Sequence, residues 1–300
     1  MVGPIFCRLK KMVAVTYAGT RIAAAVSISM FFYTLPDENL VTAAPCDPLE
    51  QLSWEVRNTA DALSLSQAVE CEGGIFAVEW TGSVVLSRNI SIAEETTLNI
   101  TGFDASIQGN GATRLFYLYD TSELHLQNLE LTGGQPQDVD SVSDGGAIHA
   151  GFDTVVSARD CFFKENRASG SGGAIVSSGL LVVDGATRFA GNSAGFAGGA
   201  IDGDQIEIRG NTTFVDNYAE SGAGGAVSSD TYTVISGFTS FINNTAGYEG
   251  GAISGYNPDV FIVVGSTMFL NNTAERGGKH SKGWMGLVCV CYYRTQFEVL

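Results

Sequence analysis

Three aspartates and an arginine are the residues whose types could act on a sugar polymer. Asp202 and Asp204 lie two positions apart in the segment GGAIDGDQI, Asp230 follows about one repeat later, and Arg209 lies nearby. Polysaccharide lyases and hydrolases use clustered outward carboxylates, with calcium or water between them, and a basic side chain. These acids do not recur in the neighbouring repeats, which favours a solvated turn over a catalytic site.

The other candidate nucleophiles and ligands form no catalytic motif. Cys161 occupies a position where four sister repeats carry threonine, which predicts a small inward-facing residue. His149 follows a repeat motif only once, which favours a surface or packing role, and His125 and His280 complete a set too small for a zinc site. The sequence contains no G-x-S-x-G, H-E-x-x-H or phosphate-binding loop. We therefore expect no catalytic residue, no metal and no cofactor.

Paired glycines set the period of the chain. The first members of successive pairs are 27, 26, 26, 26 and 27 residues apart, and five pairs are followed by alanine and then isoleucine or valine. Such a period is typical of a solenoid, a propeller or a repeat array. The pairs are Gly145-Gly146, Gly172-Gly173, Gly198-Gly199, Gly224-Gly225, Gly250-Gly251 and Gly277-Gly278.

A second motif, F-x-x-N-x-A, keeps step with the glycine pairs over five copies. We interpret its residues as structural, with the phenylalanines forming an internal aromatic ladder and the asparagines a hydrogen-bonded amide ladder in a turn. The phenylalanines are Phe163, Phe189, Phe214, Phe241 and Phe269. The asparagines are Asn166, Asn192, Asn217, Asn244 and Asn272.

The segments between the motifs predict strands. Counting back from each phenylalanine in steps of two gives threonine, glycine and a β-branched residue, while the intervening positions are largely polar. This two-residue alternation predicts an all-β fold, a right-handed single-stranded parallel β-helix with about 26 residues in each coil. Less regular segments upstream raise the expected number of coils to eight or nine, and residues 53–69 could form a short capping helix at the N-terminal end.

The N-terminal residues predict a targeting segment. A basic flank precedes an uncharged apolar run of fourteen residues, 22–35, and small residues at 41 and 43 offer a cleavage point. This layout is typical of a signal peptide, with an uncleaved signal anchor as the alternative. We expect residues 1–43 to be this segment, 44–70 a cap, 71–278 the β-helix with regular repeats at 145–278, and 279–300 a divergent tail that lacks both motifs.

Charge and cysteine usage fit a secreted chain. The formal net charge is −16 with 16 basic and 32 acidic residues, which argues against nucleic acid as a partner. Cys46 and Cys71 could form a disulfide that closes the cap over the first coil. Five N-x-S/T sequons are candidates for glycosylation in a eukaryotic secretory pathway. They are Asn89, Asn99, Asn211, Asn243 and Asn271.

The combination of Gly-Gly-Ala-Ile/Val with F-x-x-N closely resembles the chlamydial polymorphic outer membrane protein repeat, tightly over 145–278 and loosely over 71–144. The resemblance implies a pectin-lyase-like β-helix exposed at the cell surface or in the cell envelope and used in adhesion. In that family a membrane β-barrel follows the repeats, and none is expected here. We therefore expect a secreted or cell-surface non-catalytic protein that contacts extracellular polysaccharide or a neighbouring cell-surface protein. The alternatives are a polysaccharide lyase or epimerase, and a fragment of a longer array.

Overall fold

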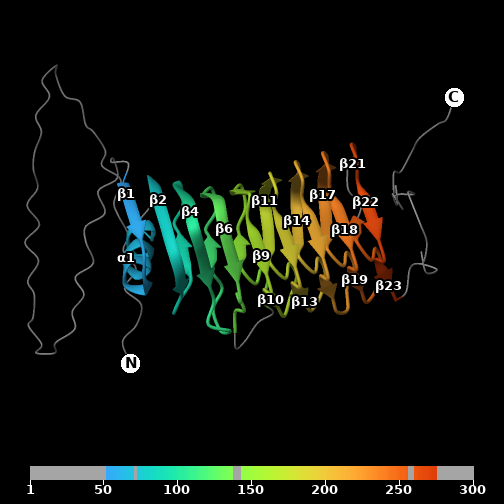
Figure 1. Cartoon of the computed structure of the whole chain (residues 1–300), viewed down its shortest axis with the longest axis horizontal. Helices are drawn as coiled ribbons and strands as arrows, with labels where there is room; N and C mark the ends of the chain where they lie inside the picture. The colour runs from blue at the N-terminus through green and yellow to red at the C-terminus, as the bar shows by residue number, and fades with distance from the viewer. Residues whose placement is uncertain (1–51, 71–72, 138–142, 256–259, 276–300) are drawn as a thin grey trace, which may run out of the picture. The chain divides into compact units, whose positions relative to one another are not determined.

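The computed structural model describes residues 52–70, 73–137, 143–255 and 260–275. The predicted targeting segment 1–43, the Cys46–Cys71 pair, His280 and the divergent tail 279–300 all lie outside the described residues. Successive coils of the chain stack in parallel with like residues above one another, in about eight turns (Figure 1). The structure thus confirms the predicted all-β solenoid.

Each coil contributes strands to three faces and, in the regular repeats, to a small fourth sheet. The first face contains β3 (Ile90–Ile92), β5 (Phe116–Leu118), β7 (Ile148–Ala150), the starts of β11 (Ile175–Asp184), β14 (Ile201–Ile208) and β17 (Val227–Ile235), and β20 (Ile253–Gly255).

The second face contains β1 (Leu52–Val56), the first parts of β2 (Gly74–Val85), β4 (Thr96–Gln108) and β6 (Glu123–Thr132), then β8 (Val155–Arg159), the later parts of β11, β14 and β17, and β21 (Val260–Val263). The third face contains the ends of β2, β4 and β6, then β9 (Phe162–Lys164), β12 (Arg188–Ala190), β15 (Thr213–Val215), β18 (Ser240–Ile242) and β22 (Met268–Leu270). The small sheet contains β10 (Arg167–Ala168), β13 (Ser193–Ala194), β16 (Tyr218–Ala219), β19 (Thr245–Ala246) and β23 (Thr273–Ala274).

Alternation of apolar and polar residues decides which side chains enter the core. Along β11, buried and partly exposed positions alternate from end to end. Because parallel strands stack in register, each inward position forms a column of like residues through the coils. The inward column of the third face changes along the molecule from aliphatic to aromatic residues. Its members are Val84, Ile107, Leu131, Phe163, Phe189, Phe214, Phe241 and Phe269.

The two glycines of each pair have different roles. The first glycine adopts a left-handed backbone, as at Gly198 with φ of 62°. The second lies against the next coil: a Cβ on Gly199 would be 2.1 Å from the carbonyl oxygen of Gly225 and 2.6 Å from the amide nitrogen of Tyr218. The pair therefore combines a turn that needs positive φ with an approach too close for any side chain.

The N-terminal end of the solenoid carries one helix, α1 (Thr59–Val69), which buries Ala62 and Leu65 against the first strands. The helix begins after Asn58, whose side-chain oxygen accepts hydrogen bonds from the amides of residues 60 and 61. The prediction that the helix could begin at Ser53 was wrong. Residues 52–56 form β1, which pairs with β2, because their apolar and polar residues alternate with a period of two.

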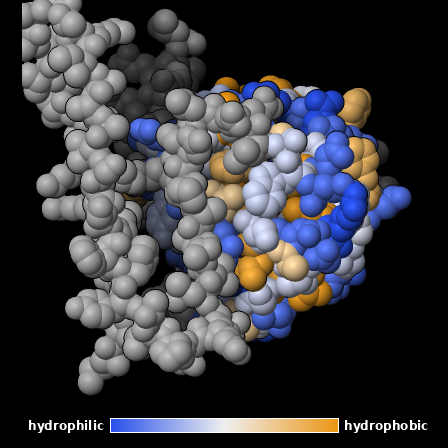
Figure 2. Space-filling view, turned by 90° about the vertical axis from the view of Figure 1, so that its left-hand side faces the viewer, coloured by the Kyte–Doolittle hydropathy of each residue, from blue (hydrophilic) through white to orange (hydrophobic). Residues whose placement is uncertain are grey.

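Hydrophilic and hydrophobic residues are interspersed on the visible surface at this end of the molecule (Figure 2). Among the described residues, no helix is long and apolar enough to cross a membrane.

Candidate functional site

The motif phenylalanines form one continuous stack inside the third face. Neighbouring rings lie 4.7 to 5.1 Å apart between centroids and are within 8° of parallel. Phe163, Phe189, Phe214 and Phe241 are fully buried, and Phe269 packs against the same core. The four buried rings have no exposed surface with which to contact a ligand, and Phe269 is partly exposed at the last described coil, so the role of the stack is in the core.

The motif asparagines form a ladder in which every amide atom has a partner. The side-chain oxygen of Asn192 accepts from the backbone amide and the side-chain amide of Asn166, both at 3.1 Å. The side-chain amide of Asn192 donates to the carbonyl of Phe163 at 3.1 Å and to the side chain of Asn217 at 3.0 Å. The same pattern continues through Asn244 to Asn272. These bonds join successive coils at a turn that water does not reach.

Asp202 lies on the outward side of the first face, where it is only partly exposed. Burial raises the pKa of Asp202 to about 6, the nearby carboxylates of Asp230 and Asp144 add to the rise, and hydrogen bonds from Ser228 and Ser171 oppose it. Burial also raises the pKa of Asp204, and burial together with Asp204 raises that of Asp230. The three predicted acids therefore share one surface and repel one another when charged.

The structure separates Arg209 from this acidic surface. Arg209 follows the end of β14 and pairs with the carboxylate of Glu207. Among the described residues, no three His, Cys, Asp or Glu side chains are grouped closely enough to hold a metal ion. The sequence-predicted carboxylates thus come together away from Arg209, the basic residue that the sequence grouped with them.

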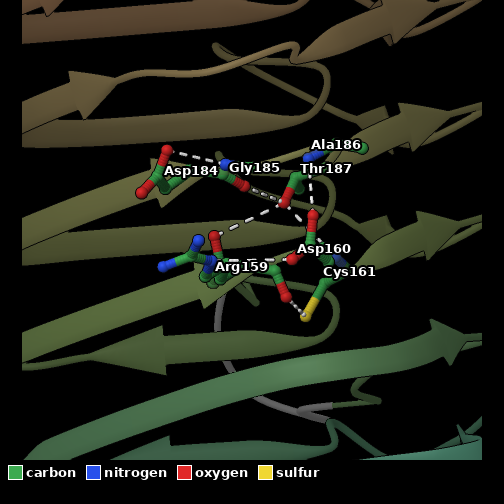
Figure 3. A network of polar contacts seen from close by, with 8 residues as sticks. Arg159, Asp160, Cys161, Asp184, Gly185, Ala186 and Thr187 are labelled. Carbon is green, nitrogen blue, oxygen red and sulfur yellow. Dashed lines mark hydrogen bonds and ion pairs between the residues drawn. The ribbon is translucent and has the colours of Figure 1, made fainter.

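Cys161 lies inside the turn between β8 and β9 (Figure 3). Its thiol is buried and donates to the carbonyl of Arg159 at 3.2 Å, and burial raises its pKa to about 11. Thr187 occupies the equivalent position one coil on and donates to the carbonyl of Asp184 at 2.7 Å. Next to Cys161, Asp160 accepts from the amide of Ala186 at 2.8 Å. A thiol in this environment stays protonated, which makes it a poor nucleophile.

The His149 ring stacks on the Tyr117 ring on the first face, with 4.9 Å between the ring centroids.

Two of the five sequons lie at exposed turns of the coil. Asn243 and Asn271 are exposed, and both have a left-handed backbone, a conformation that asparagine tolerates better than most residues. The threonines that complete these two sequons belong to β19 and β23, so each sequon is assembled from residues that the coil itself requires.

The other sequons differ in exposure. Asn211 is exposed, whereas Asn89 and Asn99 are partly buried. The side-chain amides of these two residues donate to the hydroxyl of Ser91 at 2.9 Å and to the carbonyl of Phe76 at 3.3 Å. Since a glycan would be attached at that nitrogen, Asn211, Asn243 and Asn271 remain the accessible candidates among the five.

One group on the second face was not singled out from the sequence. His125 Nδ1 lies 2.7 Å from the Ser157 hydroxyl, and His125 Nε2 lies 3.2 Å from a carboxylate oxygen of Glu123. Spacing alone places Glu123 and His125 on the same side of β6. His125 and Ser157 are 32 positions apart, which differs from the period of the glycine pairs, so the sequence did not show that these two residues are neighbours.

The fold and its motif ladders define a parallel β-solenoid of stacked, repeated coils. The model of the Chlamydia polymorphic membrane protein (Chlamydia_PMP) repeat matches residues 160–178 and 238–256, and each match contains one F-x-x-N motif and one glycine pair. The family model therefore matches two segments of the regular repeats. No curated protein and no solved structure matches the chain.

Proposed function

We propose that the protein is a secreted or surface-displayed β-helical module that binds a polysaccharide or a protein of a neighbouring cell. The observation that carries the proposal is that the repeat motif is buried while the outward positions differ from coil to coil. On the first face the outward column changes from Tyr117 through His149, Val176 and Asp202 to two serines, Ser228, which is buried, and Ser254. A constant interior with a variable exterior suits a rod that presents a recognition surface, and the polymorphic membrane protein repeat supports a surface location.

Three exposed aromatic side chains lie beside the small sheet of the regular repeats, and we call them the aromatic edge. Phe196 is 50% exposed, Tyr218 is 38% exposed and Tyr248 is 44% exposed. Phe196 and Tyr248 occupy the same turn two coils apart, a separation of about 10 Å along the solenoid. Exposed aromatic residues are enriched at binding interfaces because they bury a large area with little loss of side-chain entropy. We place partner contact at this edge.

Attachment of protein-coated beads to epithelial monolayers tests the proposal. Beads carrying the chain should attach well above beads carrying serum albumin. The variant Phe196→Ser, Tyr218→Ser, Tyr248→Ser should lower attachment by about tenfold or more. The control variant Phe103→Ser, Phe238→Ser removes aromatic residues that are 55% and 68% exposed at other turns, and should attach normally.

Treating the monolayers with glycosidases or with proteases then separates a polysaccharide partner from a protein partner. Attachment no greater than that of albumin would contradict the binding proposal. Equal losses in the triple variant and its control would contradict the placement of the contact at the aromatic edge.

A further inference from the structure

Three polar side chains on the outward side of the second face are arranged as a nucleophile, a base and an orienting acid. Ser157 on β8 contacts His125 on β6, and His125 contacts Glu123 on the same strand. We propose that Glu123, His125 and Ser157 form a hydrolytic relay that cleaves carboxylic esters carried on an extended polymer. This activity goes beyond the proposed binding role and does not depend on it.

The two hydrogen bonds select one tautomer of the imidazole. Glu123 accepts a hydrogen bond, so the nitrogen that it faces, Nε2, carries the proton. Nδ1 is then an acceptor, and its partner at 2.7 Å is the hydroxyl of Ser157. A serine hydroxyl held against a basic nitrogen whose ring is oriented by a carboxylate is the arrangement that activates serine as a nucleophile.

The relay is open to solvent and has a cation on the same side of its strand. The side chains of His125 and Glu123 are 34% and 44% exposed, and Ser157 is partly exposed. Arg159 lies two residues beyond Ser157 on the same side of β8, about 6.6 Å along the strand, with a side chain that is 62% exposed. Its guanidinium lies 3.6 Å from the carboxylate of Asp160, and by turning back along the strand it would reach over Ser157 and stabilise negative charge on an ester oxygen.

The chemistry is a two-step acyl transfer that needs only water. Ser157 Oγ attacks the ester carbonyl while His125 takes the hydroxyl proton, and Arg159 stabilises the oxyanion. The carbon–oxygen bond to the leaving alcohol breaks as His125 returns the proton to that alcohol, which leaves an acyl group on Ser157. Water then attacks the acyl group with His125 again as base, and the acid and the free serine are released.

The shape of the site selects the class of substrate. A small cavity among the described residues lies beneath α1, lined by Ala62, Leu86 and Ile90, and not at Ser157. Val155 and Val182 flank Ser157 on a sheet, so no enclosing walls surround a small substrate. A polymer lying along this face would be held by contacts on several coils, and its pendant acyl groups would reach the serine.

A fluorophosphonate probe and acetylated xylan test the relay on the full chain. We expect mass spectrometry to locate the phosphonyl group on Ser157, and we expect acetate release from the polymer. Ser157→Ala should abolish labelling, and His125→Gln should lower both labelling and acetate release by about 100-fold or more. Glu123→Gln should give a smaller loss. All three positions face outward, so circular dichroism should show an unchanged fold.

Two matched variants serve as controls. Ser240→Ala removes an outward serine whose stacked neighbours are Thr213 and Met268, and His149→Gln removes a histidine that stacks on Tyr117. Both should keep full labelling and acetate release. Labelling of Ser157 no greater than that of Ser240, or equal rates in wild type and Ser157→Ala, would overturn the relay. Labelling without acetate release would overturn the assignment to polymer esters.

Discussion

The coils before residue 143 and the coils after it reach the same fold with different residues. In the earlier coils the inward column of the third face is aliphatic, with Val84, Ile107 and Leu131, and in the later coils it is a stack of phenylalanines. Both columns are buried, so either class of side chain fills the interior. The solenoid therefore requires a column of inward apolar residues, and the aromatic ladder is one way to build it.

The turns between coils satisfy their backbone groups in two ways. In the earlier coils and at the first regular repeats, an aspartate accepts from an amide of the next coil: Asp120 from Phe152 at 2.9 Å, Asp144 from Ser171 at 2.7 Å, and Asp160 from Ala186 at 2.8 Å. At the turn of the F-x-x-N motif, each asparagine accepts instead from the backbone amide of the asparagine in the preceding coil. In regular repeats, an asparagine can hydrogen-bond to the same asparagine of the neighbouring coil. In irregular coils, the backbone groups of each turn need a different hydrogen-bond partner.

The largest effect expected within this comparison is loss of one rung of the asparagine ladder. Asn192→Ala removes four hydrogen bonds, leaves the buried backbone amide of Asn166 without its acceptor and takes one of two acceptors from the Asn166 side chain. We expect a loss of about 4 kcal/mol in the free energy of unfolding, measured by urea denaturation. The control Asn211→Ala, at an exposed position, should change it by less than about 0.5 kcal/mol. A similar small change for Asn192→Ala would show that the ladder does not stabilise the coils.

Glycine substitutions compare the two regions directly. Gly199→Ala should cost about 3 kcal/mol because the new Cβ would lie 2.1 Å from a carbonyl oxygen of the next coil. Gly82→Ala in an earlier coil meets no atom within 4 Å and has a φ of 71°, so it should cost only about 1 kcal/mol for the left-handed backbone. Urea denaturation of the two variants gives the difference. Equal costs would mean that close approach between coils is not what the second glycine provides.

Asp202→Asn should stabilise the protein in a pH-dependent way. The folded chain raises the pKa of Asp202 from 3.8 to about 6, so ionising it above pH 6 costs about 3 kcal/mol, and asparagine should recover about 2 kcal/mol. Below pH 3.8 the carboxyl is protonated in both the folded and the unfolded chain, and the gain should vanish. Urea denaturation at pH 3.5 and pH 7.5 measures it. A gain of the same size at both values would exclude ionisation as the cause.

The smallest effect is expected from replacing one phenylalanine of the stack with an aliphatic residue, as in the earlier coils. Phe163→Leu places leucine next to Leu131 and should cost about 1 kcal/mol, because the leucine still packs on one aliphatic neighbour. Phe214→Leu, between two stacked rings, should cost about twice as much. Thermal denaturation of both variants measures the difference. The reverse order would show that the aromatic stack gains nothing from its length.

Much of the interior was predictable from the sequence because the repeat has a nearly constant length. The phenylalanines and the asparagines recur every 25 to 28 residues, close to the period of the glycine pairs, and each lies above the next. The inward position of Cys161 followed from its alignment with Thr187. The sequence does not show why each glycine of a pair is required, because both reasons select the same residue type. The structure shows positive φ at the first glycine and a close approach to the next coil at the second.

The candidate sites depended on the tertiary structure. The sequence determined the period, the inward columns and the solenoid, because these follow from spacing within one chain. Tertiary structure decided that Asp202 is partly buried beside other carboxylates while Arg209 lies elsewhere, and that His125 meets Ser157. Each of these depends on which residues of different coils are neighbours. Where loops between strands vary in length, counting along the chain cannot supply that register.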